Sequence, residues 1–434
     1  MVSFAHMADV HLGHRQYGLD QRKEDVRASF EDAVDRIIDE GVYFVLLAGD
    51  LFHSRDVDAE TLDVAESQLS RLKDENVEVI AVEGNHDAGL YREELSWMEY
   101  LHKKNLLTLL AADFDGDSVF RPPALDDEEV PGYVNCEGVR VFGVQYLGQR
   151  FTERIPRILE GIESVNDGTE PKLTVLLAHF GVSGQIPGAL GVPVNKARKL
   201  AKSVDYVALG HFHRRFEMGS IHNPGSLEAH SRRQAEWERG FYFLDVAPEK
   251  GFLVAHESSR DRPYCSVRFD VGSSDTPSEL KPDFESSLEK RKRDFSQPPV
   301  VSLTLEGDLG FSREELNLNW FENMTEDMLG ALHVVVNDAT ESTAVSPLLE
   351  ELESEGAEIS SGQGSLDRDK LEGAVFERIA ADDSRYSGKS EEVAGAMSLA
   401  KRMLLTGEEP TSVAEELKSK RRDFSPTGSE EGKE

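Results

Sequence analysis

Aspartate, asparagine and histidine side chains follow five apolar segments of this 434-residue sequence, each at the point where the segment ends. The residues are Asp9, His11, Asp50, Asn85, His179, His211 and His213. Oxygen and nitrogen donors of this kind suit a borderline divalent ion such as Mn²⁺, Fe²⁺ or Zn²⁺. Seven ligands fill two four-coordinate sites only if one ligand is shared. We expect Asp50 to bridge two ions, because a carboxylate has two oxygens and Asp50 is central in the order.

Two divalent ions about 3.5–4 Å apart can clamp a phosphate, lower the pKa of a bridging water and stabilise charge on both in-line oxygens. His86 directly follows Asn85, so its imidazole would lie beyond the ions, where it could stabilise or protonate the leaving oxygen. Asp87 could orient that imidazole. His53, three residues after Asp50, is either a further functional side chain or an ordinary loop residue.

Each motif alone has a structural explanation. A single Asp-x-His pair is more often structural than ligating, and Gly84–Asp87 alone is consistent with a turn, because Gly and Asn favour turns. A metal site is favoured because the motifs occur together, each after an apolar strand. We interpret the histidines outside the motifs as structural or surface residues; they are His6, His14, His102, His222, His230, His256 and His333.

Alternating strand and helix patterns place the candidate ligands along one edge of a sheet. Amphipathic helices are expected at residues 21–41 and 59–75. The strands expected before the ligands are residues 2–8, 42–48, 77–82, 173–177 and 205–209. Open α/β folds bind their ligands at the carboxyl edge of the sheet. The sequence therefore predicts an α/β fold with a metal site at that edge.

The pattern of elements changes near residue 260, which predicts more than one domain. The expected parts are a catalytic α/β domain (1–260), a small α+β domain (262–340), a linker (341–366), a helical segment (367–422) and a disordered tail (423–434).

Acidic residues outnumber basic residues by 82 to 48, giving a formal net charge of -34. The hydrophobic content of 39% argues against disorder over most of the length, so we interpret the charge as adaptation to a salt-rich cytoplasm. Cys136 and Cys265 are far apart, which suggests a reducing compartment. No apolar segment is long enough to span a membrane, and the expected location is cytoplasmic.

These motifs resemble the signatures of the calcineurin-like metallophosphoesterases, in the order Asp9-x-His11, Gly49-Asp50, Gly84-Asn85-His86-Asp87, His179 and Gly210-His211-x-His213. Within that superfamily, Gly49–His53, the Asn223–Ser226 turn and the trailing small domain resemble the nuclease subunit of the DNA double-strand-break repair complex. The resemblance implies a four-layer sandwich, a small α+β DNA-capping domain and a C-terminal helical segment.

The resemblance also implies a ligand scheme and an activity. One Mn²⁺ ion would take Asp9, His11, Asp50 and His213, and the other Asp50, Asn85, His179 and His211. His86 would be the catalytic histidine, and His53 would contact the scissile strand. The implied activity is a 3′-to-5′ exonuclease on duplex DNA and an endonuclease on single strands. The implied partners are DNA, a second copy of the chain, and an SMC-like ABC-type repair ATPase bound by the C-terminal helices.

Basic pairs stand out from the acidic background and are candidate phosphate contacts, although a solvated charged surface is the alternative. The residues proposed to contact DNA are Arg214, Arg215, Asn223, Ser226, Arg232 and Arg233. Gly388-Lys389-Ser390 does not predict ATP binding, because Asp383 stands where a phosphate-binding loop needs glycine.

Two other functions remain compatible with the same ligands. A phosphoesterase for a small phosphodiester or a phosphoprotein would share every metal ligand, but it would not need a capping domain and a helical segment. A scaffold without activity would be expected to have lost some ligands or His86.

Overall fold

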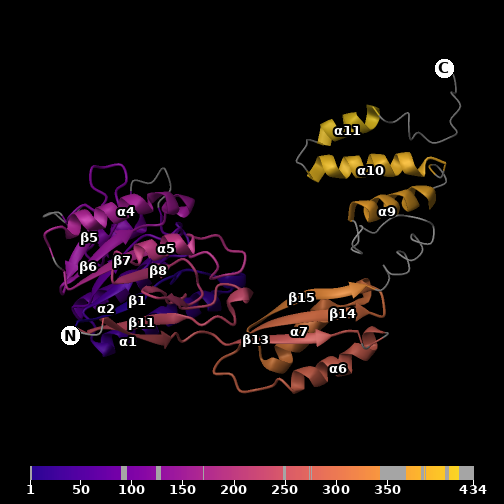
Figure 1. Cartoon of the computed structure of the whole chain (residues 1–434). Helices are drawn as coiled ribbons and strands as arrows, with labels where there is room; N and C mark the ends of the chain where they lie inside the picture. Colours follow the sequence, from indigo (N-terminus) through magenta and orange to yellow (C-terminus); the bar gives the residue numbers. More distant parts are fainter. Residues whose placement is uncertain are drawn as a thin grey trace. The chain divides into compact units, whose positions relative to one another are not determined.

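The structure is a computed structural model (Figure 1) that describes residues 2–88, 95–123, 129–169, 171–247, 251–272, 274, 276–342, 368–382, 386, 388–405 and 410–419. The chain divides into two compact units. The first comprises residues 1–267, 291–303 and 322–335, and the second comprises residues 268–290, 304–321 and 336–434. Most of the expected linker and all of the expected tail lie outside the described residues.

The first six-stranded sheet has the order β12-β11-β1-β2-β3-β4. Its strands are β1 (Val2–Met7), β2 (Phe44–Leu47), β3 (Glu78–Ala81), β4 (Thr108–Leu109), β11 (Gly240–Ala247) and β12 (Gly251–Ser258). Strands β1 to β4 run parallel, and β11 pairs antiparallel to β1 and β12. Every residue of β2 is buried, because layers of the protein cover both faces of the sheet.

The second six-stranded sheet has the order β5-β6-β7-β8-β10-β9. Its strands are β5 (Tyr133–Cys136), β6 (Val139–Val144), β7 (Leu173–His179), β8 (Tyr206–Gly210), β9 (Phe216–Met218) and β10 (Ile221–Asn223). Strands β6, β7, β8 and β10 are parallel, so the chain after β7 and β8 leaves from the same edge.

Side chains from the facing surfaces of the two sheets pack together in one core cluster, which includes Phe4, Phe44, Val141, Leu177 and Tyr206. The rings of Phe4 and Phe44 stack with centroids 4.7 Å apart. An apolar layer therefore fills the space between the two six-stranded sheets.

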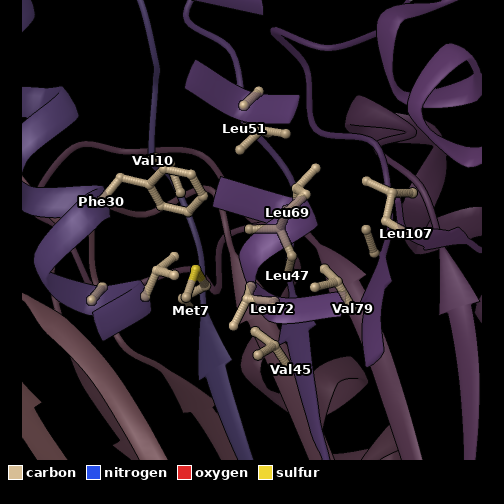
Figure 2. Close-up of a cluster of buried hydrophobic side chains, with 14 of the residues drawn as sticks. Met7, Val10, Phe30, Val45, Leu47, Leu51, Leu69, Leu72, Val79 and Leu107 are labelled. Carbon is tan, nitrogen blue, oxygen red and sulfur yellow. The ribbon is translucent and has the colours of Figure 1, made fainter. Parts of the chain in front are cut away.

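Helices cover the outer surface of each sheet. Helices α1 (Asp20–Glu40) and α2 (Ala59–Asp74) pack on the first sheet, where Phe30, Leu69 and Leu72 contact β-strand side chains (Figure 2). Helix α4 (Phe151–Asn166) and the short α5 (Val194–Leu200) cover the second sheet. The expected four-layer α/β sandwich is confirmed.

Local sequence explains where the helices begin and end. Helix α1 ends at Gly41, whose φ of 70° is the left-handed conformation that glycine adopts without strain. Asp58 caps α2, and its side chain accepts the Thr61 N–H. Helix α3 (Trp97–Lys103) has a capping box between Ser96 and Glu99. The sequence analysis did not predict α3, β4 or α5, which are short.

A three-stranded sheet of order β13-β14-β15 follows, built from β13 (Tyr264–Asp270), β14 (Val300–Leu309) and β15 (His333–Ser342). It is accompanied by helices α6 (Pro277–Glu289) and α7 (Leu318–Leu329). Phe284 of α6 contacts Phe269 and Phe321, with ring centroids 5.0 and 4.8 Å away. These elements match the α+β pattern expected after residue 262, whereas the domain boundaries stay predictions.

Three further helices lie in the C-terminal part: α9 (Arg368–Asp382), α10 (Ser390–Leu405) and α11 (Pro410–Ser419). Helix α10 contacts both α9 and α11. Among the described residues, no helix has the length and apolar character needed to cross a membrane.

Removing a ring from the core between the sheets should destabilise the first unit strongly. We expect Phe44→Ala to lower the free energy of unfolding by about 3–5 kcal/mol, because it deletes a fully buried ring and leaves a cavity. The neighbouring Tyr43 is 45% exposed, so Tyr43→Ala is the matched control with a smaller loss. Denaturant unfolding at constant salt measures both, and equal losses would contradict the core assignment.

Candidate metal centre and active site

The seven predicted metal ligands lie together at the carboxyl ends of the parallel strands. Asp9 and His11 follow β1, Asp50 follows β2, Asn85 follows β3, and the remaining histidines end or follow β7 and β8. Both sheets therefore contribute ligands to one region. Because strand ends from two facing sheets meet there, residues up to about 200 positions apart in the chain come into hydrogen-bonding distance.

One group of donor atoms surrounds His11. Its Nε2 lies 3.1 Å from Nε2 of His213 and 3.7 Å from Oδ2 of Asp50. Two donors bound to one ion at 2.0–2.1 Å are about 3 Å apart when they are adjacent in its coordination sphere. The separation of the two imidazole nitrogens fits that arrangement.

A second group surrounds Asn85. Its Oδ1 lies 3.1 Å from Nε2 of His179 and 2.9 Å from Nδ1 of His211. Oδ2 of Asp50 is 3.3 Å from the same nitrogen of His179. The single oxygen Oδ2 of Asp50 thus lies near both donor groups, which is the position that a bridging carboxylate requires.

Asp9 lies beside the bridging carboxylate. Ligand atoms of Asp9, Asp50 and His179 lie within 4.8 Å of one another. The Asp9 carboxylate also accepts the backbone N–H of His211, at 3.0 Å from each oxygen. That contact fixes the carboxylate and ties the loop after β8 to the loop after β1.

Several ligands occupy an unfavourable backbone conformation. Asp9, His11, Asp50 and His211 have φ values of 53°, 54°, 55° and 84°, in the left-handed region that L residues rarely adopt. Such strain concentrates at functional sites, where surrounding contacts enforce it. The loops that follow β1, β2 and β8 therefore each carry a ligand with positive φ.

Two glycines make room for the ligands. A Cβ atom at Gly49 would clash with the imidazole of His179, and one at Gly84 would clash with the carboxylate and backbone of Asp50. The glycines of the Gly49-Asp50 and Gly84-Asn85 motifs are therefore required by close approach.

The charge balance of the centre demands a cation. Burial raises the pKa of Asp9 to about 8 and, together with the Asp50 charge, raises that of Asp87 to about 6. Burial also opposes ionisation of Asp50, but the adjacent His179 overcomes it and lowers the Asp50 pKa to about 2. In return, Asp50 raises the pKa of His179 to about 9 against the effect of burial. Three buried carboxyl groups so close together can all ionise only if positive charge is supplied.

The donor set fits divalent metal ions. The Nδ1–H group of His179 donates to the Ala48 carbonyl at 2.7 Å, which leaves Nε2 free to bind an ion. The remaining donors are carboxylate oxygens, an amide oxygen and imidazole nitrogens, which suit Mn²⁺, Fe²⁺ or Zn²⁺. In the scheme that the resemblance implies, Asp9, His11, Asp50 and His213 would hold one ion and Asp50, Asn85, His179 and His211 the other.

His86 and His53 both border the predicted metal centre. Nδ1 of His86 lies 2.6 Å from the His53 carbonyl, so this nitrogen carries a proton and donates it to the carbonyl oxygen. The His86 ring lies 4.8 Å from that of His11, and the His53 ring 5.3 Å from that of His86. Nε2 of His86 is thereby left as the nitrogen that can give or take a proton.

Asp87 does not have the contact expected for it. Its carboxylate accepts backbone N–H groups from Asp50, Phe52 and Gly84 at 2.7–3.0 Å. The His53 carbonyl, and not Asp87, contacts the His86 imidazole. Asp87 is 3% exposed, and by accepting these N–H groups it connects the loop that follows β2 with the loop that follows β3.

Three residues that the sequence analysis did not select also belong to this region. Gln234 accepts the backbone N–H of His230 through Oε1 at 2.8 Å, and its Nε2 lies 3.0 Å from Nδ1 of His213. The Gln234 amide therefore fixes the orientation of the His213 ring. His14 and His230 are the other two, and their nitrogens are 2.7 Å apart. The only sequence signals were the proximity of His14 to His11 and of His230 to the Asn223–Ser226 turn.

The six residues expected to contact DNA differ in burial and in their partners. Asn223 and Ser226 are fully buried and bond the carbonyls of Gly210 and Glu228, so their side chains are structural. Arg215 is paired with Glu217 and Glu238. The other expected contacts, Arg214, Arg232 and Arg233, stay predictions; Arg214 and Arg233 are exposed, and Arg232 is half-buried.

The first half of the chain matches a known family. Residues 2–215 match the profile of the calcineurin-like phosphoesterases. The matched region contains all seven predicted ligands, from Asp9 to His213.

The relatives with this domain include archaeal repair proteins. The chain is 32% identical over 215 residues to the DNA double-strand break repair protein Mre11 of Methanococcus maripaludis, covering 49% of this chain and 52% of that protein. Mre11 of Methanopyrus kandleri is 30% identical over 270 residues, covering 59% and 56%. Mre11 of Methanocaldococcus jannaschii is 26% identical over 345 residues, covering 78% and 83%. The chain thus spans about half the length of the first two relatives.

Filling the space beside the bridging carboxylate should abolish the metal centre. We expect Gly84→Ala to weaken Mn²⁺ binding by at least about tenfold, because the new methyl group displaces Asp50. Gly373→Ala is the matched control, since nothing lies within 4 Å of its Cβ position. Isothermal titration calorimetry measures both variants, and unchanged binding by Gly84→Ala would contradict the geometry.

Metal affinity should increase with pH. In the metal-free protein Asp9 holds a proton below about pH 8 and His179 below about pH 9, and both protons must leave before these groups can bind a cation. The apparent Kd for Mn²⁺ should therefore decrease as the pH rises through this interval. A Kd that is constant or increases there would show that the two groups are not ligands.

Proposed function

We propose that the chain is a two-metal DNA nuclease of double-strand-break repair. In this proposal it acts with Mn²⁺ as a 3′-to-5′ exonuclease on duplex DNA and as an endonuclease on single strands. The observation that carries the proposal is Oδ2 of Asp50, placed near both donor groups, with the imidazole of His86 beside them. The similarity to archaeal proteins named for DNA double-strand break repair supports DNA as the substrate.

Two bound divalent ions would clamp the scissile phosphate and lower the pKa of the attacking water. The chain's own part is acid–base chemistry and positioning. His86 can protonate the leaving oxygen through Nε2, because its Nδ1 proton is committed to the His53 carbonyl. Asp87 keeps the loops of Asp50 and Gly84 in register through backbone N–H groups. His53, whose ring lies 5.3 Å from that of His86, would contact the strand being cut.

Arg214, Arg232 and Arg233 would contact DNA phosphates outside the centre. The net charge of -34 opposes DNA binding at low salt through its long-range field. In molar salt the Debye length falls to about 3 Å, so local contacts decide. We therefore propose that the protein works in a salt-rich cytoplasm. Most of its affinity for DNA would come from metal–phosphate bonds, dimer avidity and the ATPase partner.

The C-terminal helices would bind an SMC-like ABC-type ATPase, and the active form would be a dimer. A groove of about 420 Å³ lies along α10 and α11, lined mainly by Val393, Ala396, Met397, Ala400 and Leu417. Ile379 and Leu404 are 55% and 53% exposed, as expected of apolar side chains available to a partner.

The nuclease assignment is tested by digestion of 3′-labelled linear duplex DNA in molar KCl. We expect release of mononucleotides with Mn²⁺, none with EDTA, and a loss of about 10²–10⁴-fold in His86→Ala because it lacks the proton donor. Tyr43→Ala, which changes an exposed residue at the amino end of β2, opposite the end that carries Asp50, is the control. Hydrolysis of a small phosphodiester without digestion of DNA would instead support a phosphoesterase for small substrates.

The role of the helical segment is tested by deleting residues 366–434. Binding of the partner ATPase should be lost while Mn²⁺-dependent nuclease activity is kept, because every metal ligand lies in the first unit. Co-purification and the digestion assay measure the two properties. Loss of both would show that the helices are needed for folding of the rest.

A further inference from the structure

Two histidines outside the sequence motifs border the predicted metal centre. The ring of His230 lies 4.6 Å from that of His11 and 5.0 Å from that of His213. The ring of His14 stacks on His53 at 3.9 Å. His230 is therefore in contact with two of the predicted ligands of one ion, although it is far from both in the sequence.

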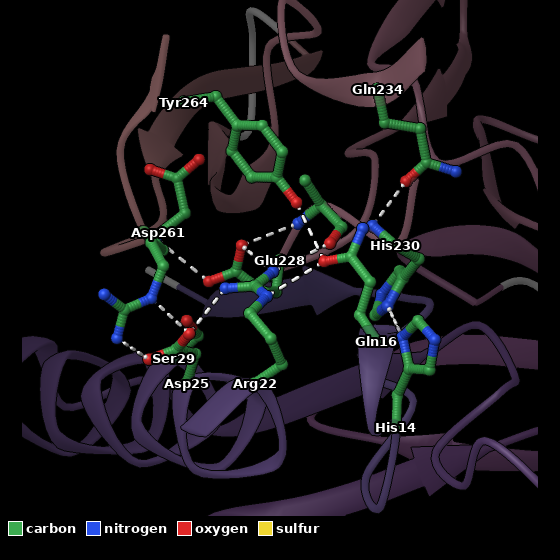
Figure 3. Close-up of polar contacts among 12 residues, drawn as sticks. His14, Gln16, Arg22, Asp25, Ser29, Glu228, His230, Gln234, Asp261 and Tyr264 are labelled. Carbon is green, nitrogen blue, oxygen red and sulfur yellow. Dashed lines mark hydrogen bonds and ion pairs between the residues drawn. The ribbon is translucent and has the colours of Figure 1, made fainter. Parts of the chain in front are cut away.

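The hydrogen bond between the two histidines identifies the free nitrogen of His230. Nδ1 of His14 and Nδ1 of His230 are 2.7 Å apart, so one of them donates a proton to the other (Figure 3). The other ring nitrogen of His230, Nε2, is buried and has no hydrogen-bond partner. A buried polar atom without a protein partner needs an explanation, such as a bound ion or an ordered water.

The spacing of the donors indicates what that ligand is. His11, His213 and His230 each offer a nitrogen atom, and these atoms lie within 4.8 Å of one another. Three imidazoles that converge in this way can bind one transition-metal ion. A proton donated from Nδ1 of His230 to His14 would leave Nε2 with its lone pair available, as in metal-ligating histidines.

The segment that carries His230 is held rigidly. Its backbone N–H donates to Oε1 of Gln234 at 2.8 Å. The preceding carbonyl, that of Ala229, accepts from Arg22 at 2.9 Å, and Arg22 also pairs with the fully buried Glu228 at 3.0 Å (Figure 3). Removing either partner of such a buried pair leaves an uncompensated charge, so the pair strongly restrains the segment.

We propose that His230 is an additional ligand of the ion held by His11, Asp50 and His213, and that His14 orients it. This inference rests on the two-metal centre of the proposed function. It gives that site one imidazole more than the site of Asn85, His179 and His211. Imidazole ligands favour ions such as Zn²⁺, Fe²⁺ and Co²⁺ over Mg²⁺, so the two sites should differ in metal preference.

Titration of the full-length, metal-free chain with Co²⁺ tests the proposal without reference to activity, because the visible spectrum of Co²⁺ reports its ligands. His230→Phe removes the nitrogen and keeps an aromatic ring. We expect one of the two sites to bind Co²⁺ about tenfold or more weakly, with a changed spectrum, and the other site to be unaffected. His14→Phe should show a smaller weakening of the same site.

His222→Phe is the matched control. This buried histidine stacks on Tyr206 of the core between the two sheets, and its substitution should leave both sites unchanged. His230→Gln provides a second variant should His230→Phe fail to fold, as judged by circular dichroism. Two unchanged Co²⁺ sites in a folded His230 variant would overturn the ligand assignment, and a loss of DNA binding alone would make His230 a substrate contact. Fewer than two ions bound by the unaltered chain would instead contradict the two-metal function itself.

Discussion

The structure of the first unit depends on an electrostatic constraint: three buried carboxyl groups lie close together with too little positive charge. Asp9, Asp50 and Asp87 are each at most 3% exposed. Backbone N–H groups satisfy Asp87, and His179 compensates Asp50, but the pKa of Asp9 is still raised to about 8 by burial. Bound divalent cations would compensate these charges. The apolar layers around the centre strengthen the repulsion, because they lower the local dielectric constant.

This arrangement requires strained backbone conformations and close contacts between the loops. Four ligands adopt positive φ, and two glycines lie where any larger residue would collide with a ligand. These features are stable because the strand ends that carry them are anchored in the core between two six-stranded sheets. The chemistry is thus supported by rigid elements, as precise metal geometry requires.

Much of the fold and of the site could be predicted from the sequence. All seven candidate ligands were predicted from apolar segments that end in a polar residue. Such a segment and its motif lie within a few consecutive residues, so the sequence alone reveals both. The short elements α3, β4 and α5 were missed because seven residues or fewer carry too little periodicity. That the strands form two separate sheets came from the family resemblance, since periodicity alone does not reveal which strands pair.

Several site residues have contacts in the structure that the sequence analysis did not predict. The cause is the same in each case, because tertiary contacts decide the role of a loop residue. Asp87 is adjacent to His86 in sequence, yet its carboxylate turns toward the backbone of Asp50. The sequence analysis proposed that Asn223 and Ser226 contact DNA, but both side chains are buried. The sequence analysis interpreted His14 and His230 as structural or surface residues. They are more than 200 residues apart in the chain, and only the fold shows that their Nδ1 atoms lie 2.7 Å from each other.

The most direct test of the central claim is anomalous X-ray diffraction from crystals grown with Mn²⁺. The account predicts two peaks about 3.5–4 Å apart, one on each side of Oδ2 of Asp50. One peak should lie against His11 and His213, and the other against Asn85, His179 and His211. A single peak, or peaks away from Asp50, would contradict the shared-carboxylate centre on which the proposed chemistry rests.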